Sequence, residues 1–140
     1  MILRAHTFLL ALLFACVTVY PISAAAHANA TDQSAVLQSV LDYPQLQAFL
    51  HPKSPGRVPV SVFVRGAALG IRAEKFGAAV HILTKDSRPA PTVIRLTQFS
   101  IGDDTAEVAL HYPVEGIDGR FSLRCDGKVW RVTRANIHET

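Results

Sequence analysis

The fold is decided by residues 92–137, which read TVIRLTQFSIGDDTAEVALHYPVEGIDGRFSLRCDGKVWRVTRANI. Within this stretch, four segments are rich in β-branched residues or alternate apolar with polar residues, as half-buried strands do. They are 92–101, 105–112, 120–125 and 128–137. Gly102-Asp103-Asp104 and Asp126-Gly127 are turn sequences between them. Four consecutive strands joined in this way predict an antiparallel meander.

The residues before the meander predict a helix and further strands. Apolar residues recur at helical spacing behind a capping residue at Thr31 or Asp32; they are Val36, Leu37, Val40 and Leu41. Pro44 interrupts the pattern, so residues 31–51 form one helix or two helices kinked before that proline. The alternating valines of 58–64 predict a strand, which Pro59 favours at the sheet edge. We therefore expect an α+β fold, with an N-terminal helix packed on a curved antiparallel β-sheet that ends in the four-strand meander.

The first 30 residues predict a secretory signal peptide. Residues 1–6 contain one arginine and no acid, and the apolar run 7–20 is too short for an ordinary membrane-spanning helix. Ala26-His27-Ala28 and Ala28-Asn29-Ala30 both fit the small-x-small cleavage rule. We expect a periplasmic or secreted protein that begins at Asn29 or Thr31, with a single domain over 31–140 and no membrane span after cleavage.

Two alternatives to cleavage are a retained membrane anchor and a lipoprotein. Leu13-Phe14-Ala15-Cys16 is similar to a lipoprotein processing site, where Cys16 would carry the lipid. Phe14 is bulky for that position, and the apolar run continues past Cys16. The cleaved signal is therefore the favoured interpretation.

The domain that remains is close to neutral and has one cysteine. Arg4 is the one charged residue before Thr31, which leaves 13 of the 14 basic residues and all 11 acids, a net charge of +2. Nucleic acid is therefore not an expected partner. Cys125 has no cysteine to pair with, and its alternation with Phe121 and Leu123 predicts a buried, unreactive thiol.

No pattern in the domain names a reaction. The four remaining histidines fall at no metal-ligand spacing, and neither a nucleophile motif nor a phosphate-binding glycine loop occurs, so we expect no metal site and no cofactor. Glu115 lies among apolar residues between two strands. We expect it at a solvated loop tip, with a buried catalytic acid as the alternative. Trp130 is expected in the core.

One face of the meander carries the candidate binding residues. Alternation places several polar side chains on the same side, unless a bulge reverses the pattern; they are Glu107, His111, Arg120, Ser122, Arg124, Arg131 and Thr133. Pairing the strands through a loop at 113–119 brings His111 near Arg120 and Glu107 near Arg124. The interpretation we test is an anion- or partner-binding face with His111 as a pH-sensitive member. A solvated face with ordinary cross-strand ion pairs is the alternative.

The order of the elements resembles the cystatin-like superfamily, which includes nuclear-transport-factor-like and ketosteroid-isomerase-like domains. The resemblance is carried by the strand 105–112 and by Asp126-Gly127-Lys128-Val129-Trp130-Arg131-Val132. It implies a fold and no activity, because the isomerase branch uses a pocket Tyr and two Asp residues that have no counterpart set in this chain.

These observations predict a small non-catalytic binding or interaction domain in the cell envelope, of the inhibitor or immunity-protein type. A small-ligand carrier and an isomerase- or dehydratase-like enzyme, each with a pocket between helix and sheet, are the alternatives. A high-affinity partner recovered from the cell envelope would favour the first class, and a deep apolar pocket with a polar pair would favour the others. The most useful single observation is whether core side chains fill the concave face of the sheet or leave it open.

Overall fold

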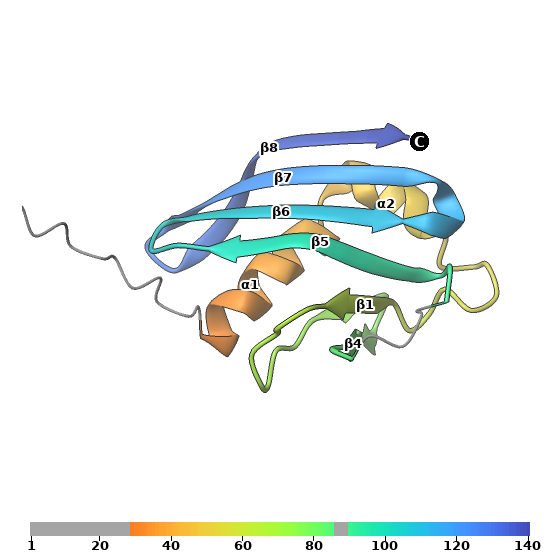
Figure 1. Cartoon of the computed structure of the whole chain (residues 1–140), viewed down its shortest axis with the longest axis horizontal. Helices are drawn as coiled ribbons and strands as arrows, with labels where there is room; N and C mark the ends of the chain where they lie inside the picture. The colour runs from red at the N-terminus through yellow and green to blue at the C-terminus, as the bar shows by residue number, and fades with distance from the viewer. Residues whose placement is uncertain (1–28, 86–89) are drawn as a thin grey trace, which may run out of the picture.

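The computed structural model describes residues 29–85 and 90–140 of the 140-residue chain. Helices α1 (Ala30–Leu41) and α2 (Pro44–Leu50) lie on one side of a six-stranded sheet (Figure 1). The sheet strands are β1 (Ser61–Val64), β4 (His81–Leu83), β5 (Val93–Ile101), β6 (Thr105–Tyr112), β7 (Ile117–Asp126) and β8 (Val129–Glu139). A small hairpin, β2 (Glu74–Lys75) and β3 (Ala78–Ala79), and a 3-10 turn, η1 (Pro113–Glu115), complete the fold.

The N-terminal segment forms two helices rather than one. Tyr43 is extended, with φ −64° and ψ 125°, because the ring of Pro44 disfavours the helical conformation in the residue before it. The predicted cap at Thr31 or Asp32 is wrong: the helix begins earlier, and the Asn29 side chain accepts a hydrogen bond from the Asp32 amide at 2.9 Å.

The predicted four-strand meander is confirmed, since β5, β6, β7 and β8 pair consecutively and antiparallel. The rest of the sheet differs from the expected antiparallel arrangement: β1 pairs in parallel with both β4 and β5, so the α+β fold has a mixed sheet. Pro59 was expected to mark an edge strand, yet β1 lies between two strands. The reason is that β1 starts at Ser61, past the proline, so the missing N–H is not needed for pairing.

The core lies between the two helices and the inward face of the sheet. Its largest contributors are less than 2% exposed: Phe121, Leu37, Leu41, Leu46, Leu50, Ile94, Leu110, Ile117, Leu123, Val36, Val40 and Val62. Trp130 is 5% exposed and belongs to this core, and its Nε1 lies 3.3 Å from the carboxylate of Asp32 on α1. Side chains therefore fill the space between helices and sheet.

Cys125 is only half-buried, which corrects the prediction of a fully buried thiol. It does pack against the core, as its alternation indicates. Its pair with Trp130 is next to the terminal pair of the β7–β8 hairpin, Asp126 with Val129, so fewer neighbours cover it.

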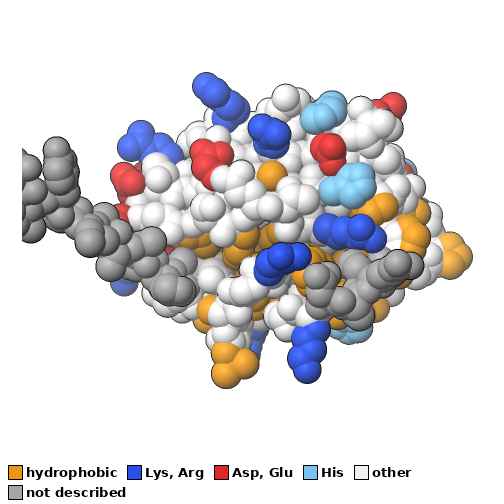
Figure 2. Space-filling view, viewed as in Figure 1, with side chains coloured by type: hydrophobic (Ala, Val, Ile, Leu, Met, Phe, Trp, Pro, Cys, Tyr) orange, Lys and Arg blue, Asp and Glu red, His pale blue; other side chains and the backbone are white. Residues whose placement is uncertain are grey.

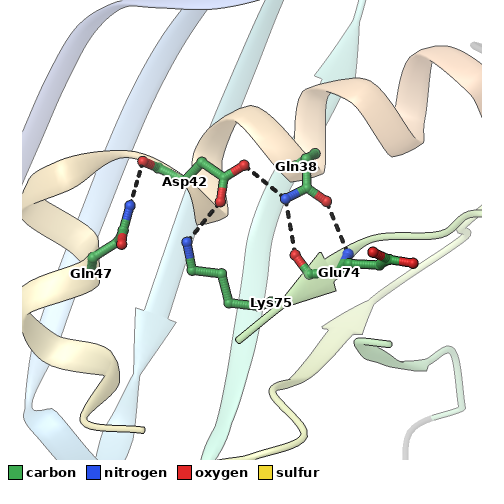
Figure 3. Close-up of polar contacts among 5 residues, drawn as sticks. All are labelled: Gln38, Asp42, Gln47, Glu74 and Lys75. Atoms are coloured by element: carbon green, nitrogen blue, oxygen red, sulfur yellow. Dashed lines mark hydrogen bonds and ion pairs between the residues drawn. The ribbon is translucent and has the colours of Figure 1, made fainter. Parts of the chain in front are cut away.

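The β2–β3 hairpin is a separate two-stranded sheet, and the side chains of Gln38 and Asp42 hold it to α1 (Figure 3). The Gln38 amide accepts from the backbone N–H of Glu74 and donates to its carbonyl, both at 2.9 Å. Lys75 is 7% exposed, and its Nζ lies 2.7 Å from Asp42 Oδ1, while Gln38 also donates to Oδ2 at 2.8 Å. Burial by itself raises the pKa of Asp42, but the hydrogen bonds from Lys75 and Gln38 outweigh it and leave this pKa below its usual value of 3.8.

The lowered pKa of Asp42 predicts a pH-dependent stability. A carboxyl group whose pKa is depressed by folding stabilises the protein above its unfolded pKa, and this stabilisation is lost as pH falls through the folded value. We expect wild type to exceed Asp42→Asn in free energy of unfolding at neutral pH, with the difference shrinking below pH 3.8. Urea melts of both proteins across pH measure it. A difference independent of pH, or one that is not reduced in a Lys75→Met background, would contradict this account.

Gly119 is required by the core rather than by backbone conformation. A Cβ at this position would lie 2.9 Å from Phe121 Cε2 and 3.3 Å from Leu110 Cδ1, and both neighbours are buried. We expect Gly119→Ala to destabilise the protein by about 1–3 kcal/mol through overpacking, as measured by urea denaturation. Gly102→Ala is the matched control, because its Cβ would approach no atom closer than 3.5 Å. Equal stability of the two variants would contradict this prediction, because it would show that Phe121 and Leu110 move to accommodate the added methyl group.

Candidate functional site

The outer face is the side of β5–β8 turned away from the helices. It carries Arg95, Glu107, Ala109, His111, Asp118, Arg120, Ser122, Arg124, Arg131, Arg134, Asn136 and His138. Figure 2 shows basic, acidic and histidine side chains gathered over these strands. Of the residues predicted to share this side, Thr133 is the exception in register: it is the extra residue of a bulge between the pairs Ser122–Arg134 and Leu123–Val132.

The pairing across β6 and β7 differs from the prediction by two residues. The connection is η1 and Gly116, which has φ +60°, so β7 begins at Ile117 and not at Arg120. Arg120 and Arg124 are therefore diagonal to His111 and Glu107 rather than directly opposite them. His111 is opposite Asp118, with Nδ1 2.7 Å from Oδ1, and Arg120 is opposite Ala109.

The other two sequence-predicted residues, Glu107 and Arg124, also have different partners. Glu107 accepts a hydrogen bond from the Ser122 hydroxyl at 3.0 Å. Arg124 lies opposite Thr105 on one side and Arg131 on the other, and its Nη2 is 3.7 Å from the carboxylate of Asp104. Both members of that ion pair are more than 60% exposed, so it contributes little to stability.

Four charged or titratable residues form a row across four neighbouring strands. Arg95 on β5 is opposite His111, His111 is opposite Asp118 on β7, and Asp118 is opposite His138 on β8. Asp118 was not among the predicted site residues, because residues 113–119 were expected to form a loop. A hairpin turn at Gly116 would have placed it on the strand, but the glycine alone does not specify the turn length.

A small hollow lies beside this row. It has a volume of about 210 Å³ and is lined by Thr97, Ala109, Leu110, Asp118, Gly119, Arg120 and His138. It exists because Ala109 presents only a methyl group and Thr97 is the extra residue of a bulge in β5. Arg120 and His138 are exposed on its rim, and Arg120 makes no ion pair within residues 29–85 and 90–140. The hollow can therefore accept a group about the size of a carboxylate beside a permanently charged guanidinium.

Glu115 belongs to a second polar cluster, at the end of the sheet. Its side chain is 16% exposed, so the expectation of a solvated loop tip is wrong. One oxygen accepts from Arg57 and the other lies 3.4 Å from His51 Nε2. Arg57 Nη1 also lies 2.5 Å from the Tyr112 hydroxyl.

The cluster of His51, Arg57, Tyr112 and Glu115, which we call the Arg57 bracket, holds two segments together and leaves neither Arg57 nor Glu115 free to bind a ligand. Burial by itself lowers the pKa of Arg57, but the hydrogen bonds with Tyr112 and Glu115 outweigh it and raise this pKa above its usual value. Nη1 of Arg57 contacts the Tyr112 hydroxyl and Nη2 contacts one oxygen of Glu115, whose other oxygen contacts His51. The bracket ties the loop after α2 to the β6–β7 connection.

A wider groove of about 540 Å³ runs between α1 and the start of β8. Its lining surface is more apolar than polar, and the lining residues are Ala35, Gln38, Ser39, Asp42, Tyr43, Pro44, Lys128, Val129, Trp130, Arg131 and Val132. It opens to the surface and does not reach between the helices and the centre of the sheet, where the core side chains lie.

Across residues 29–85 and 90–140, no cluster of three His, Cys, Asp or Glu side chains has an arrangement suited to holding a metal ion. The helices of the same residues are too short or too polar to span a membrane. The predicted signal peptide and Cys16 lie outside the described residues. The chain matches no protein-family model, no curated protein and no solved structure.

Proposed function

We propose that the chain is an exported, non-catalytic binding domain whose outer face recognises a partner through carboxylates or similar anionic groups. The observation that carries the proposal is the pairing of Arg124 directly opposite Arg131. Like charges at opposed positions destabilise a sheet. An anionic partner placed over both arginines would remove this repulsion and gain charge-assisted hydrogen bonds.

The remaining charges of the outer face support recognition over simple solvation. A solvated face would be expected to pair Glu with Arg across strands, but Glu107 lies between Ser100 and Ser122. Arg120, Arg131 and Arg134 make no ion pair with any described residue. These three guanidinium groups lie on the outer face, with Arg120 at the hollow, and a ligand can bind them without breaking an ion pair.

The filled space between helices and sheet supports a binding module over a carrier or an isomerase-like enzyme. A ligand there would have to displace side chains such as Leu37, Val40 and Phe121, each at most 1% exposed. The second candidate is a small-ligand carrier that uses the groove between α1 and β8, and the apolar lining of Tyr43 and Val132 favours it. An inhibitor or immunity-type role fits the first candidate, because such proteins act through an exposed surface.

Export is part of the proposal, and it gives a prediction about the mature N-terminus. Cleavage after Ala28 keeps Asn29, whose side chain caps α1, whereas cleavage after Ala30 removes that cap at a cost of about 1 kcal/mol. We expect intact-mass analysis of the exported protein to give a chain that begins at Asn29. A lipid-modified species that begins at Cys16, or an uncleaved chain, would contradict this part of the proposal.

The binding function is tested with the double variant Arg120→Ala/Arg124→Ala. We expect the partner captured from a cell-envelope extract by wild type to bind the variant at least 30-fold more weakly, since an arginine in a desolvated contact is often worth about 2 kcal/mol. The free energy of unfolding should change by less than about 0.5 kcal/mol, because both side chains are exposed. Binding of wild type should also weaken with salt.

The matched control removes two exposed charges elsewhere. Lys53→Ala/Arg72→Ala changes the net charge equally, but both residues lie in segments that are not part of the outer face. Equal affinity of wild type and the Arg120/Arg124 variant, with the variant folded, would move the site to the groove between α1 and β8. Equal weakening by both double variants would indicate attraction to net charge alone.

A further inference from the structure

The outward side of β8 is an exposed edge of the sheet. The strand order ends at β8, which has β7 as its one neighbour and runs for 11 residues. The Thr140 amide donates to the Gly116 carbonyl at 2.7 Å, so the backbone of Thr140 faces the chain that leads into β7. Backbone direction alternates along a strand, so Asn136 and His138 also turn their N–H and C=O groups toward β7. By alternation, Ala135 and Ile137 turn theirs away from the sheet.

Only the beginning of this edge is covered within residues 29–85 and 90–140. The Ser39 hydroxyl of α1 donates to the Trp130 carbonyl at 2.9 Å, so the helix occupies the edge there. Beyond the bulge at Thr133, no described strand pairs with the outward groups of Ala135 and Ile137. Natural edges are usually blunted by prolines, bulges, short length or charged side chains. Residues 134–139 contain no proline or bulge, and their charged residues are Arg134 and Glu139.

The side chains beside the open edge differ on its two faces. Arg134 and His138 lie on the outer face and are exposed, whereas Ala135 and Ile137 are half-buried and pack against the core. A strand added to this edge would place alternate side chains next to these two sets. Arg134 and His138 favour acidic side chains in the added strand, whereas Ala135 and Ile137 favour apolar ones.

We propose that residues 134–139 of β8 dock an extended segment of a partner protein, in which acidic and apolar residues alternate, as a seventh strand of the sheet. Main-chain hydrogen bonds to Ala135 and Ile137 hold the segment, and its acidic side chains reach Arg134 and the outer face. This inference rests on the proposed function and deepens it, because it names how the anionic partner is held.

A second copy of the chain is a poorer occupant of the same edge. Arg131, Arg134 and His138 all lie on the outer face of β8, and the one acid of the strand, Glu139, lies on the other face. Pairing two β8 edges would bring these basic side chains of both copies together, which is destabilising. Charge complementarity therefore selects an acidic segment.

The test changes the backbone of the edge and leaves every side chain in place. Cys125 is the one cysteine of residues 29–140, so a synthetic peptide of residues 125–140 can be joined there by native chemical ligation. N-methylation of Ile137 removes an outward N–H and leaves the hydrogen bonds of Asn136 and His138 to β7 intact. The ligated protein without the methyl group is the matched control.

The probe is a capped peptide of about eight residues that alternates glutamate and valine, the length of a typical strand. A peptide of the same composition with the glutamates in one block is its control. We expect the unmodified protein to bind the alternating peptide at least tenfold more tightly than the block peptide, and N-methyl-Ile137 to weaken binding at least tenfold at an unchanged melting temperature.

Hydrogen exchange in the unmodified protein gives a second measurement that needs no altered backbone. The amides of Asn136 and His138 should be protected without peptide, and those of Ala135 and Ile137 should become protected only when the alternating peptide is added. Protection of Ala135 and Ile137 that does not respond to the peptide would overturn the proposal even if the N-methylated protein fails to fold.

Other outcomes separate the edge from the outer face. Unchanged binding by N-methyl-Ile137 overturns edge docking, and if Arg120→Ala/Arg124→Ala still abolishes binding, the proposed function survives alone. Equal binding of both peptides, or no binding of either, overturns recognition of a strand. Dimerisation of the unmodified protein that N-methylation abolishes would make a second copy the occupant and also overturn the proposal.

Discussion

The register between β6 and β7 is the constraint on which the outer face depends. The chain turns within Pro113–Glu115 and Gly116, and the Arg57 bracket holds this turn through Tyr112 and Glu115. A turn one residue longer would move every inward side chain of β7 to the other face. The same register that buries Ile117, Phe121 and Leu123 therefore sets Asp118 opposite His111 and Arg120 beside the hollow.

Much of the fold was predictable from local patterns. Period-two alternation located the four strands of the meander. It sorted inward from outward residues in β6 and β7, because the pairing of these two strands is free of bulges. The parallel pairs of β1 with β4 and β5 were not predictable, since they join segments far apart in the chain. The residues of short strands also show no pattern that distinguishes parallel from antiparallel pairing. Glu115 was misjudged for a similar reason: its partner Arg57 is distant in sequence.

The candidate site was predictable in part. The sequence placed Glu107, His111, Arg120 and Arg124 on one face, but not their neighbours, because strand pairing depends on a turn whose length the residues 113–119 do not specify. The row from Arg95 to His138 and the hollow beside Ala109 emerge only from the pairing of four strands. The sequence also did not indicate that Arg124 lies opposite Arg131, and this pair of like charges is the feature on which the proposed recognition rests.

We propose that the partner binds at the outer face and not in the groove between α1 and β8. The most direct measurement is NMR of the labelled protein during titration with its partner, following backbone amides and arginine side chains. The account predicts shift changes centred on Arg120 and Arg124, which do not line that groove, and extending to the edge of β8. Changes confined to Tyr43, Val132 and the other residues of the groove between α1 and β8 would contradict it.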